Sequence, residues 1–221
     1  MNHSMTVSFR TLVAAATVLA AMAVQAQDVK GDVQAGQKKA EMCIGCHGIA
    51  GYQNSFPEIH KVPKISGQSD KYIVSALTAY KKGERKHPSM RGIAGSLSDQ
   101  DMADLGAFYA SHADKPAPES IKAPSAAVAA LIEKGACLSC HGANLSKPID
   151  PSYPKLGGQH ADYLFVALKA YTVEGNSVVG RANGIMGGIA KQYTPAELRA
   201  LAKYIASVDG ELKTVPQSRF R

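Results

Sequence analysis

Apolar side chains recur three and four residues apart in several stretches of this chain, the spacing that places them on one face of an α-helix. The clearest stretches are residues 72–80 and 163–171, each of which begins and ends with tyrosine. Residues 32–42 and 125–135 carry shorter patterns of the same kind. The chain is therefore predicted to have an all-α fold.

Two more helices are predicted from the residues that mark their starts. Ser98 has Asp101 three residues on, and Thr194 is followed by Pro195 and then by Glu197. A hydroxyl and a carboxylate at this spacing satisfy the free N–H groups of a first helical turn, where proline is also tolerated. One helix is therefore expected to begin near residue 98 and another near residue 194.

These elements form one module that occurs twice. Residues 63–68, with the sequence Pro-Lys-Ile-Ser-Gly-Gln, match residues 154–159, with the sequence Pro-Lys-Leu-Gly-Gly-Gln. Further along, residues 90–94 match residues 186–190, and a predicted helix follows in each case. The sequence thus predicts two similar helical domains in tandem.

A proline-rich segment separates the two domains. Residues 113–124 contain three prolines, which cannot continue a helix and which favour an extended, fairly stiff chain. We therefore place the first domain at residues 27–112, the linker at residues 113–124 and the second domain at residues 125–221. The segment after Asp209 has no periodic pattern and is expected to run over the surface.

The first 26 residues form a separate segment. Arg10 precedes a run of small and apolar residues, 12–24, and the run ends in the small-residue pattern that signal peptidase requires. The run is short for a membrane span. We therefore predict an export signal that is cleaved after Ala26, with an uncleaved anchor as the alternative.

All four cysteines lie in two Cys-x-x-Cys-His runs, at residues 43–47 and 137–141. In this pattern each thiolate adds across a vinyl group of haem, and the histidine binds the iron as its proximal ligand. The sequence therefore predicts two covalently attached haem c groups. The predicted attachment residues are Cys43, Cys46, Cys137 and Cys140, and the predicted proximal ligands are His47 and His141.

Three other uses of these cysteines explain the pattern less well. A redox dithiol needs no histidine after its second cysteine, and a structural disulfide leaves both histidines unexplained. A zinc site would require the two runs to converge, or an outside ligand for each of them. Covalent haem accounts for every residue of both motifs.

The second axial position of each iron is assigned to a methionine. Met90 and Met186 occupy matching positions, in segments predicted to be loops whose glycines let the backbone approach the porphyrin. A thioether favours ferrous iron, so ligation by histidine and methionine raises the reduction potential. The alternatives are that these methionines only fill the core, or that a histidine is the distal ligand in the first half.

Pro63 and Pro154 are the predicted supports of the proximal histidines. A proline carbonyl can accept a hydrogen bond from the imidazole and so fix its orientation; the alternative is that each proline only shapes a turn.

A basic cluster precedes Met90. The cluster is either a docking patch or a solvated helix end. It consists of Lys81, Lys82, Arg85 and Lys86.

The net charge of +7 is unevenly distributed along the chain. Residues 27–120 contain 12 Lys and Arg against 11 Asp and Glu, whereas residues 121–221 contain 12 against 7. A positive second half can orient an encounter with an acidic partner or an anionic membrane surface, or it can simply keep the protein soluble. The sequence has no basic helix or aromatic-interleaved patch that would indicate nucleic-acid binding.

With both haem motifs, both methionines, the two Pro-x-Ile/Leu-x-Gly-Gln segments and the capped last helices, the chain resembles the cytochrome c4 family of two-haem class I cytochromes c. The resemblance extends from about residue 32 to residue 208. It implies two cytochrome c domains related by a pseudo-twofold axis, with haems that face each other across the interface. The first half departs from the repeat by extra residues before Pro63, and the second by extra residues before Met186.

The resemblance also implies a function. It suggests a periplasmic electron carrier, loosely held at the membrane, between a quinol-oxidising complex and a terminal oxidase or reductase, and not an enzyme. Two alternatives remain: a haem enzyme with one open iron, of peroxidase or thiosulfate dehydrogenase type, and an electron-accepting cytochrome subunit of a dehydrogenase.

Overall fold

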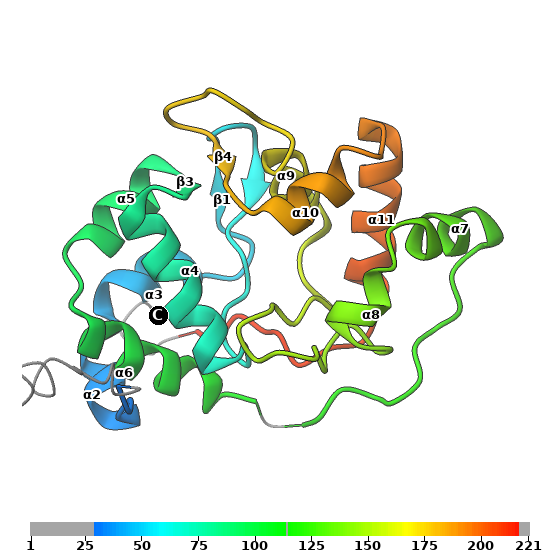
Figure 1. The fold of residues 1–221 in the computed structure, drawn as a ribbon. Helices are drawn as coiled ribbons and strands as arrows, with labels where there is room; N and C mark the ends of the chain where they lie inside the picture. Colours follow the sequence, from blue (N-terminus) through cyan, green and yellow to red (C-terminus); the bar gives the residue numbers. More distant parts are fainter. Residues whose placement is uncertain (1–28, 114, 217–221) are drawn as a thin grey trace, which may run out of the picture.

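The computed structural model describes residues 29–113 and 115–216, so the predicted export signal at residues 1–26 lies outside the described residues. Figure 1 shows two helical halves side by side. The helices of the first half are α2 (Val33–Lys39), α3 (Glu41–His47), α4 (Asp70–Lys82), α5 (Pro88–Gly95) and α6 (Asp99–Ala110). Those of the second half are α7 (Ala126–Lys134), α8 (Cys137–His141), α9 (Ala161–Ala170), α10 (Gly184–Ala190) and α11 (Pro195–Ser207).

Each half is built around a pair of long helices. In the first half α4 packs against α6, and in the second α9 packs against α11. Small residues allow these close crossings: a Cβ atom at Gly106 would lie only 2.9 Å from the carbonyl oxygen of Asp70, and Ala202 in α11 is fully buried. The helices predicted at residues 72–80 and 163–171 therefore form and supply the core of each half.

The predicted capping residues begin α6 and α11. The Ser98 side chain accepts a hydrogen bond from the N–H of Asp101, whose carboxylate in turn accepts from the N–H of Ser98. Thr194 and Glu197 make the same reciprocal pair at the start of α11. Both predicted helix starts are confirmed. They could be predicted because the signal for a helix start is contained in four consecutive residues.

The single helix predicted at residues 32–42 is instead two helices, α2 and α3, separated by Ala40. Asp104 in α6 holds α2 in place: its Oδ1 accepts from the N–H of Asp32 at 2.8 Å, and its Oδ2 accepts from Lys39 Nζ at 2.5 Å. Ala40, 2% exposed, has φ −71° and ψ −3°, which turns the chain. The break lets α2 pack on α6 while α3 takes its own direction with the Cys-x-x-Cys-His run.

Among the described residues, four two-residue strands interrupt the helices. β1 (Gln53–Asn54) pairs with β2 (His60–Lys61) within the first half, whereas β3 (Arg85–Lys86) pairs with β4 (Gly180–Arg181) across the two halves. β2 also reaches the second half, where the N–H of Lys61 donates to Asp162 Oδ2 at 3.0 Å. The extra residues that distinguish the halves therefore lie in loops that cross to the opposite half.

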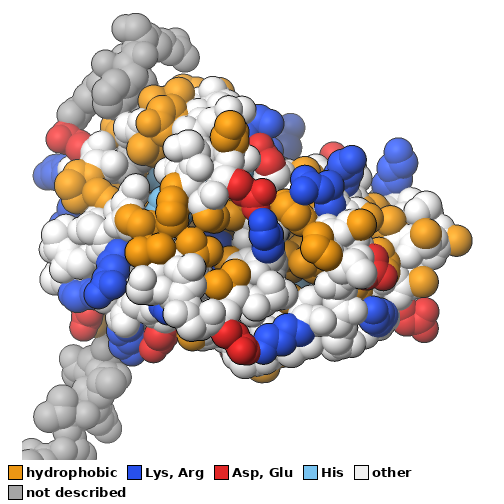
Figure 2. Space-filling view, turned by 90° about the horizontal axis from the view of Figure 1, so that it is seen from above, with side chains coloured by type: hydrophobic (Ala, Val, Ile, Leu, Met, Phe, Trp, Pro, Cys, Tyr) orange, Lys and Arg blue, Asp and Glu red, His pale blue; other side chains and the backbone are white. Residues whose placement is uncertain are grey.

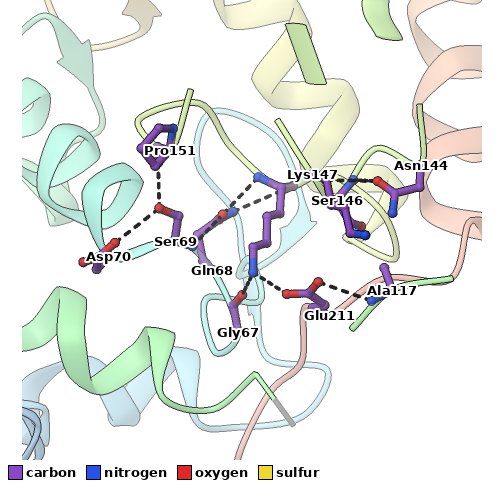
Figure 3. A network of polar contacts seen from close by, with 11 residues as sticks. Gly67, Gln68, Ser69, Asp70, Ala117, Asn144, Ser146, Lys147, Pro151 and Glu211 are labelled. Atoms are coloured by element: carbon purple, nitrogen blue, oxygen red, sulfur yellow. Dashed lines mark hydrogen bonds and ion pairs between the residues drawn. The ribbon is translucent and has the colours of Figure 1, made fainter. Parts of the chain in front are cut away.

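The segment after Asp209 does not run over the surface as predicted. It passes between the halves, where Leu212 is 6% exposed and the N–H of Lys213 donates to the carbonyl oxygen of Ser66. The carboxylate of Glu211 pairs with Lys155, and its Oε1 accepts from the N–H of Ala117 in the linker (Figure 3). The sequence did not indicate that this segment would be buried, because its contacts join residues far apart in the chain.

We expect Glu211→Ala to lower the free energy of unfolding by about 3 kcal/mol, because it leaves the Lys155 ammonium buried without its counter-charge. The two side chains of this pair are only 18% and 10% exposed. Glu174→Ala is the matched control, because its pair with Lys191 is 50% and 74% exposed and should change stability by less than about 1 kcal/mol. Chemical denaturation followed by circular dichroism measures both, and equal effects of the two substitutions would contradict the expectation.

Candidate haem-binding sites

One cavity of about 1030 Å³ extends across both halves. Its walls come mainly from α4, α5, α9 and α10 and from the segments around the two Pro-Lys sequences. All eight of the predicted attachment and iron-ligating residues line it: Cys43, Cys46, His47, Met90, Cys137, Cys140, His141 and Met186. The fold thus brings together, around one space, residues that the sequence separates by more than half of the chain.

The cysteines are placed by the short helices α3 and α8. All four are free, so none is committed to a structural disulfide. Burial raises the pKa of the Cys43 and Cys137 thiols. In the part of the chain that the structure describes, three or more His, Cys, Asp or Glu side chains nowhere gather closely enough to hold a metal ion.

Both predicted proximal histidines point one ring nitrogen at the predicted proline. His47 Nδ1 lies 2.9 Å from the carbonyl oxygen of Pro63, and His141 Nδ1 lies 3.2 Å from that of Pro154. Burial lowers the pKa of each imidazole and so favours its neutral form. A neutral ring that donates from Nδ1 keeps the lone pair of Nε2 for a metal.

Met90 and Met186 lie in helices, α5 and α10, and not in the predicted loops. Capping residues explain the difference: His87 Nδ1 accepts from the N–H of Met90, and Asn183 Oδ1 accepts from the N–H of Met186. Pro88 also occupies the first turn of α5, where its fixed φ suits a helix. These starting signals outweigh the low helix propensity of the glycines that follow each methionine.

Two histidines of the first half also line the cavity. His60 is 5% exposed and its Nδ1 lies 2.8 Å from the carbonyl oxygen of Glu58, while His87 Nδ1 serves as the cap of α5. Each of these rings uses Nδ1 for a backbone contact. A distal histidine in the first half therefore stays an alternative to Met90.

Two arginines and their tyrosine partners lie where the halves meet; the sequence placed Arg85 in a basic cluster and indicated no role for Arg181. Arg85 donates to the hydroxyl oxygen of Tyr72 at 3.1 Å and to that of Tyr163, in the other half, at 2.7 Å. Arg181 donates to the same Tyr163 hydroxyl at 3.2 Å. Arg85 therefore does not belong to an exposed basic cluster. Arg85 and Arg181 are as far apart in the sequence as Met90 and Met186, and this repeat could have indicated that the two arginines have equivalent roles.

The arginines provide a test of whether haem fits this cavity. Within the described residues, Arg85 Nε is buried and has no hydrogen-bond partner. Buried guanidinium groups need an anion or acceptors to offset their lost hydration. Haem has a flat apolar ring and carboxylate substituents, so a largely apolar cavity lined by two sets of cysteines and histidine and by two guanidinium groups fits two such groups.

Comparison with known proteins agrees with this fit. The sequence model of the cytochrome c family matches the chain twice, at residues 33–113 and 125–209. Cytochrome c4 of Pseudomonas aeruginosa is 33% identical over 181 residues, covering 79% of this chain and 88% of that protein. A thiosulfate dehydrogenase electron acceptor of Thiomonas intermedia is 30% identical over 182 residues, covering 78% of this chain and 81% of that protein.

A solved structure shows the same arrangement of helices. Reduced recombinant cytochrome c4 from Pseudomonas stutzeri superposes with a TM-score of 0.59 at 28% identity, over 80% of this chain and 99% of that chain. Two cytochrome c domains imply two haem c groups held by thioether bonds. The chain therefore belongs to the cytochrome c4 family of two-haem cytochromes c.

Proposed function

We propose that this two-haem electron carrier holds both of its irons in closed coordination, by His47 with Met90 and by His141 with Met186. Cys43 and Cys46 would attach the first haem, as Cys137 and Cys140 would attach the second. The observation that carries the proposal is that these residues all line one cavity, with each histidine oriented by a proline carbonyl. We also propose the domain limits of residues 27–112 and 125–221, joined by the linker at 113–124.

Closed coordination suits electron transfer better than catalysis. Haem iron supplies a one-electron couple between its ferric and ferrous states. Met90 and Met186 would keep other ligands from the metal, and α4 and α9 supply apolar walls of the cavity. Because one cavity contains both sites, two bound haems would share one protein-lined space.

The partners follow from family membership and surface chemistry. We propose transfer from a quinol-oxidising complex to a terminal oxidase or reductase. On the face shown in Figure 2, apolar side chains gather near the middle and Lys and Arg side chains lie around them. An apolar centre with a charged rim is the usual composition of a transient protein interface. A second candidate function is that of an electron-accepting cytochrome for a dehydrogenase. The similarity to a thiosulfate dehydrogenase electron acceptor favours it.

We propose a periplasmic location, supported by the export signal predicted at residues 1–26 and by haem c attachment. Within residues 29–113 and 115–216, the structure has no helix with the length and apolar character needed to span a bilayer. We propose that any association with the membrane is peripheral and involves the positive second half, whose charge suits anionic lipid.

Carbon monoxide tests the closed coordination. We expect the reduced protein to show no spectral change with carbon monoxide, because both distal positions are filled. Met90→Ala should open one iron and shift one of the two haems, and Met186→Ala should do the same for the other. Met42→Leu is the control, since Met42 is 53% exposed and is assigned no ligand role. A shift in the unmodified protein would favour the enzyme with an open iron.

Haem counting tests the attachment residues. The double substitution Cys43→Ala with Cys46→Ala should reduce the content from two haems to one, because both thioether bonds of the first site are lost. The corresponding pair at Cys137 and Cys140 should give the same count with the other haem retained. Intact mass and the pyridine haemochrome assay measure this, and two remaining haems in either variant would contradict the assignment.

Arg85 should raise the reduction potentials of both haem sites. A positive charge at the cavity wall disfavours the ferric state, which carries the extra positive charge, so Arg85→Gln should lower both potentials. Arg91→Gln is the control, because this arginine of the same half is exposed. Spectroelectrochemical titration measures the change, and unchanged potentials in the Arg85 variant would refute the expected role.

A further inference from the structure

The peptide group that orients His47 is held by a glutamine of the opposite half. The carbonyl oxygen of Pro63 and the N–H of Lys64 belong to the same peptide unit. Its oxygen lies 2.9 Å from His47 Nδ1, and its N–H donates to Gln159 Oε1 at 2.9 Å. Gln159 Nε2 in turn donates to the carbonyl oxygen of Lys64 at 2.8 Å. A continuous series of hydrogen bonds thus runs from the first histidine to the second half.

The second half repeats this arrangement with the roles exchanged. His141 Nδ1 lies 3.2 Å from the carbonyl oxygen of Pro154, and the N–H of Lys155 in the same peptide unit donates to Gln68 Oε1 at 2.9 Å. Gln68 Nε2 donates to the carbonyl oxygen of Lys155 at 3.0 Å. Figure 3 shows Gln68 beside Gly67 and Glu211 on this side of the interface.

The environment of both glutamines makes these contacts specific. Gln68 is 3% exposed and Gln159 is 5% exposed, so water is a poor substitute for either partner. Each Oε1 also accepts the N–H of the next residue, Ser69 in one case and His160 in the other, both at 3.0 Å. The amide orientation is therefore set by its own backbone, and the remaining contacts are directed at the opposite half.

We propose that Gln68 and Gln159 are positioning residues that each lower the reduction potential of the haem in the opposite half. The inference rests on the proposed ligation by His47 and His141. Hydrogen bonds in series polarise one another, so an acceptor at the peptide N–H makes the carbonyl of that peptide a better acceptor. A stronger bond at Nδ1 makes the imidazole a better electron donor to iron, and this stabilises the ferric state.

The repeated segment explains how one motif serves both halves. In residues 63–68 and 154–159, the proline and lysine form the peptide that orients the histidine of their own half. The glutamine at the end of the same segment holds the corresponding peptide of the other half. Duplication of the module therefore produces a reciprocal coupling, in which neither proximal site is complete until the halves are docked.

The experiment measures both potentials in the full-length protein with haem attached. Gln159→Leu should raise the potential of the haem at residues 43–47 and leave that at residues 137–141 unchanged, and Gln68→Leu should do the reverse. Spectroelectrochemistry gives the potentials, and assigned haem methyl resonances in proton NMR identify each haem. Gln192→Leu is the control, because this exposed side chain donates to the carbonyl oxygen of Gly188 in its own half and should move neither potential.

A second variant and a second readout separate this role from simple support of the interface. Gln159→Asn keeps a polar amide but is too short to make both contacts with Lys64, so it should shift the same haem in the same direction. The Nδ1 proton of His47 should exchange faster in both variants. Equal shifts of both haems, a shift confined to the haem of the mutated half, or no shift would overturn the proposal.

The ligation on which the inference rests is checked in the same samples. Absence of a carbon monoxide shift in the reduced variants shows that both irons are still closed, so that unchanged potentials would then count against the glutamines alone. Loss of histidine ligation in the unmodified protein would instead overturn the proposed function. The two failures therefore give different results.

Discussion

The structure depends on hydrogen bonds that satisfy buried backbone groups of one half with side chains of the other. Around an apolar cavity, each peptide N–H and carbonyl that faces the interface requires a partner, since unpaired polar groups there are costly. Gln68 and Gln159 provide hydrogen-bond partners for the backbone of the two Pro-Lys segments. Arg85 likewise donates to tyrosine hydroxyl oxygens of both halves. The relative position of the halves is therefore specified by directional contacts, and less by apolar area alone.

Local signals in the sequence predicted most of the helices and the chemistry of the sites. The caps at Ser98 and Thr194, the apolar periodicity and the two Cys-x-x-Cys-His runs each depend on residues within one or two helical turns. What the sequence did not reveal depends on distant residues. The burial of the segment around Glu211 and the cross-half contacts of Arg85 require knowledge of how the halves dock.

The positions of the two methionines show the limit of reasoning from composition. Glycines near Met90 and Met186 indicated loops, yet capping by His87 and Asn183 begins a helix at each place. A short capped helix restrains the methionine backbone more firmly than a glycine-rich loop would. Such restraint suits a carrier, because a ligand that stays in place in both oxidation states keeps the rearrangement that accompanies each electron transfer small.

The segment at residues 209–216 also bears on the order in which the molecule assembles. Glu211 and Lys213 complete the interface with Lys155 and Ser66, yet they lie far downstream of both cysteine motifs. As a chain emerges from its N-terminal end, domains fold one at a time and contacts to late segments form last. The contacts by which this segment joins the two halves can therefore form only after both cysteine motifs have been synthesised.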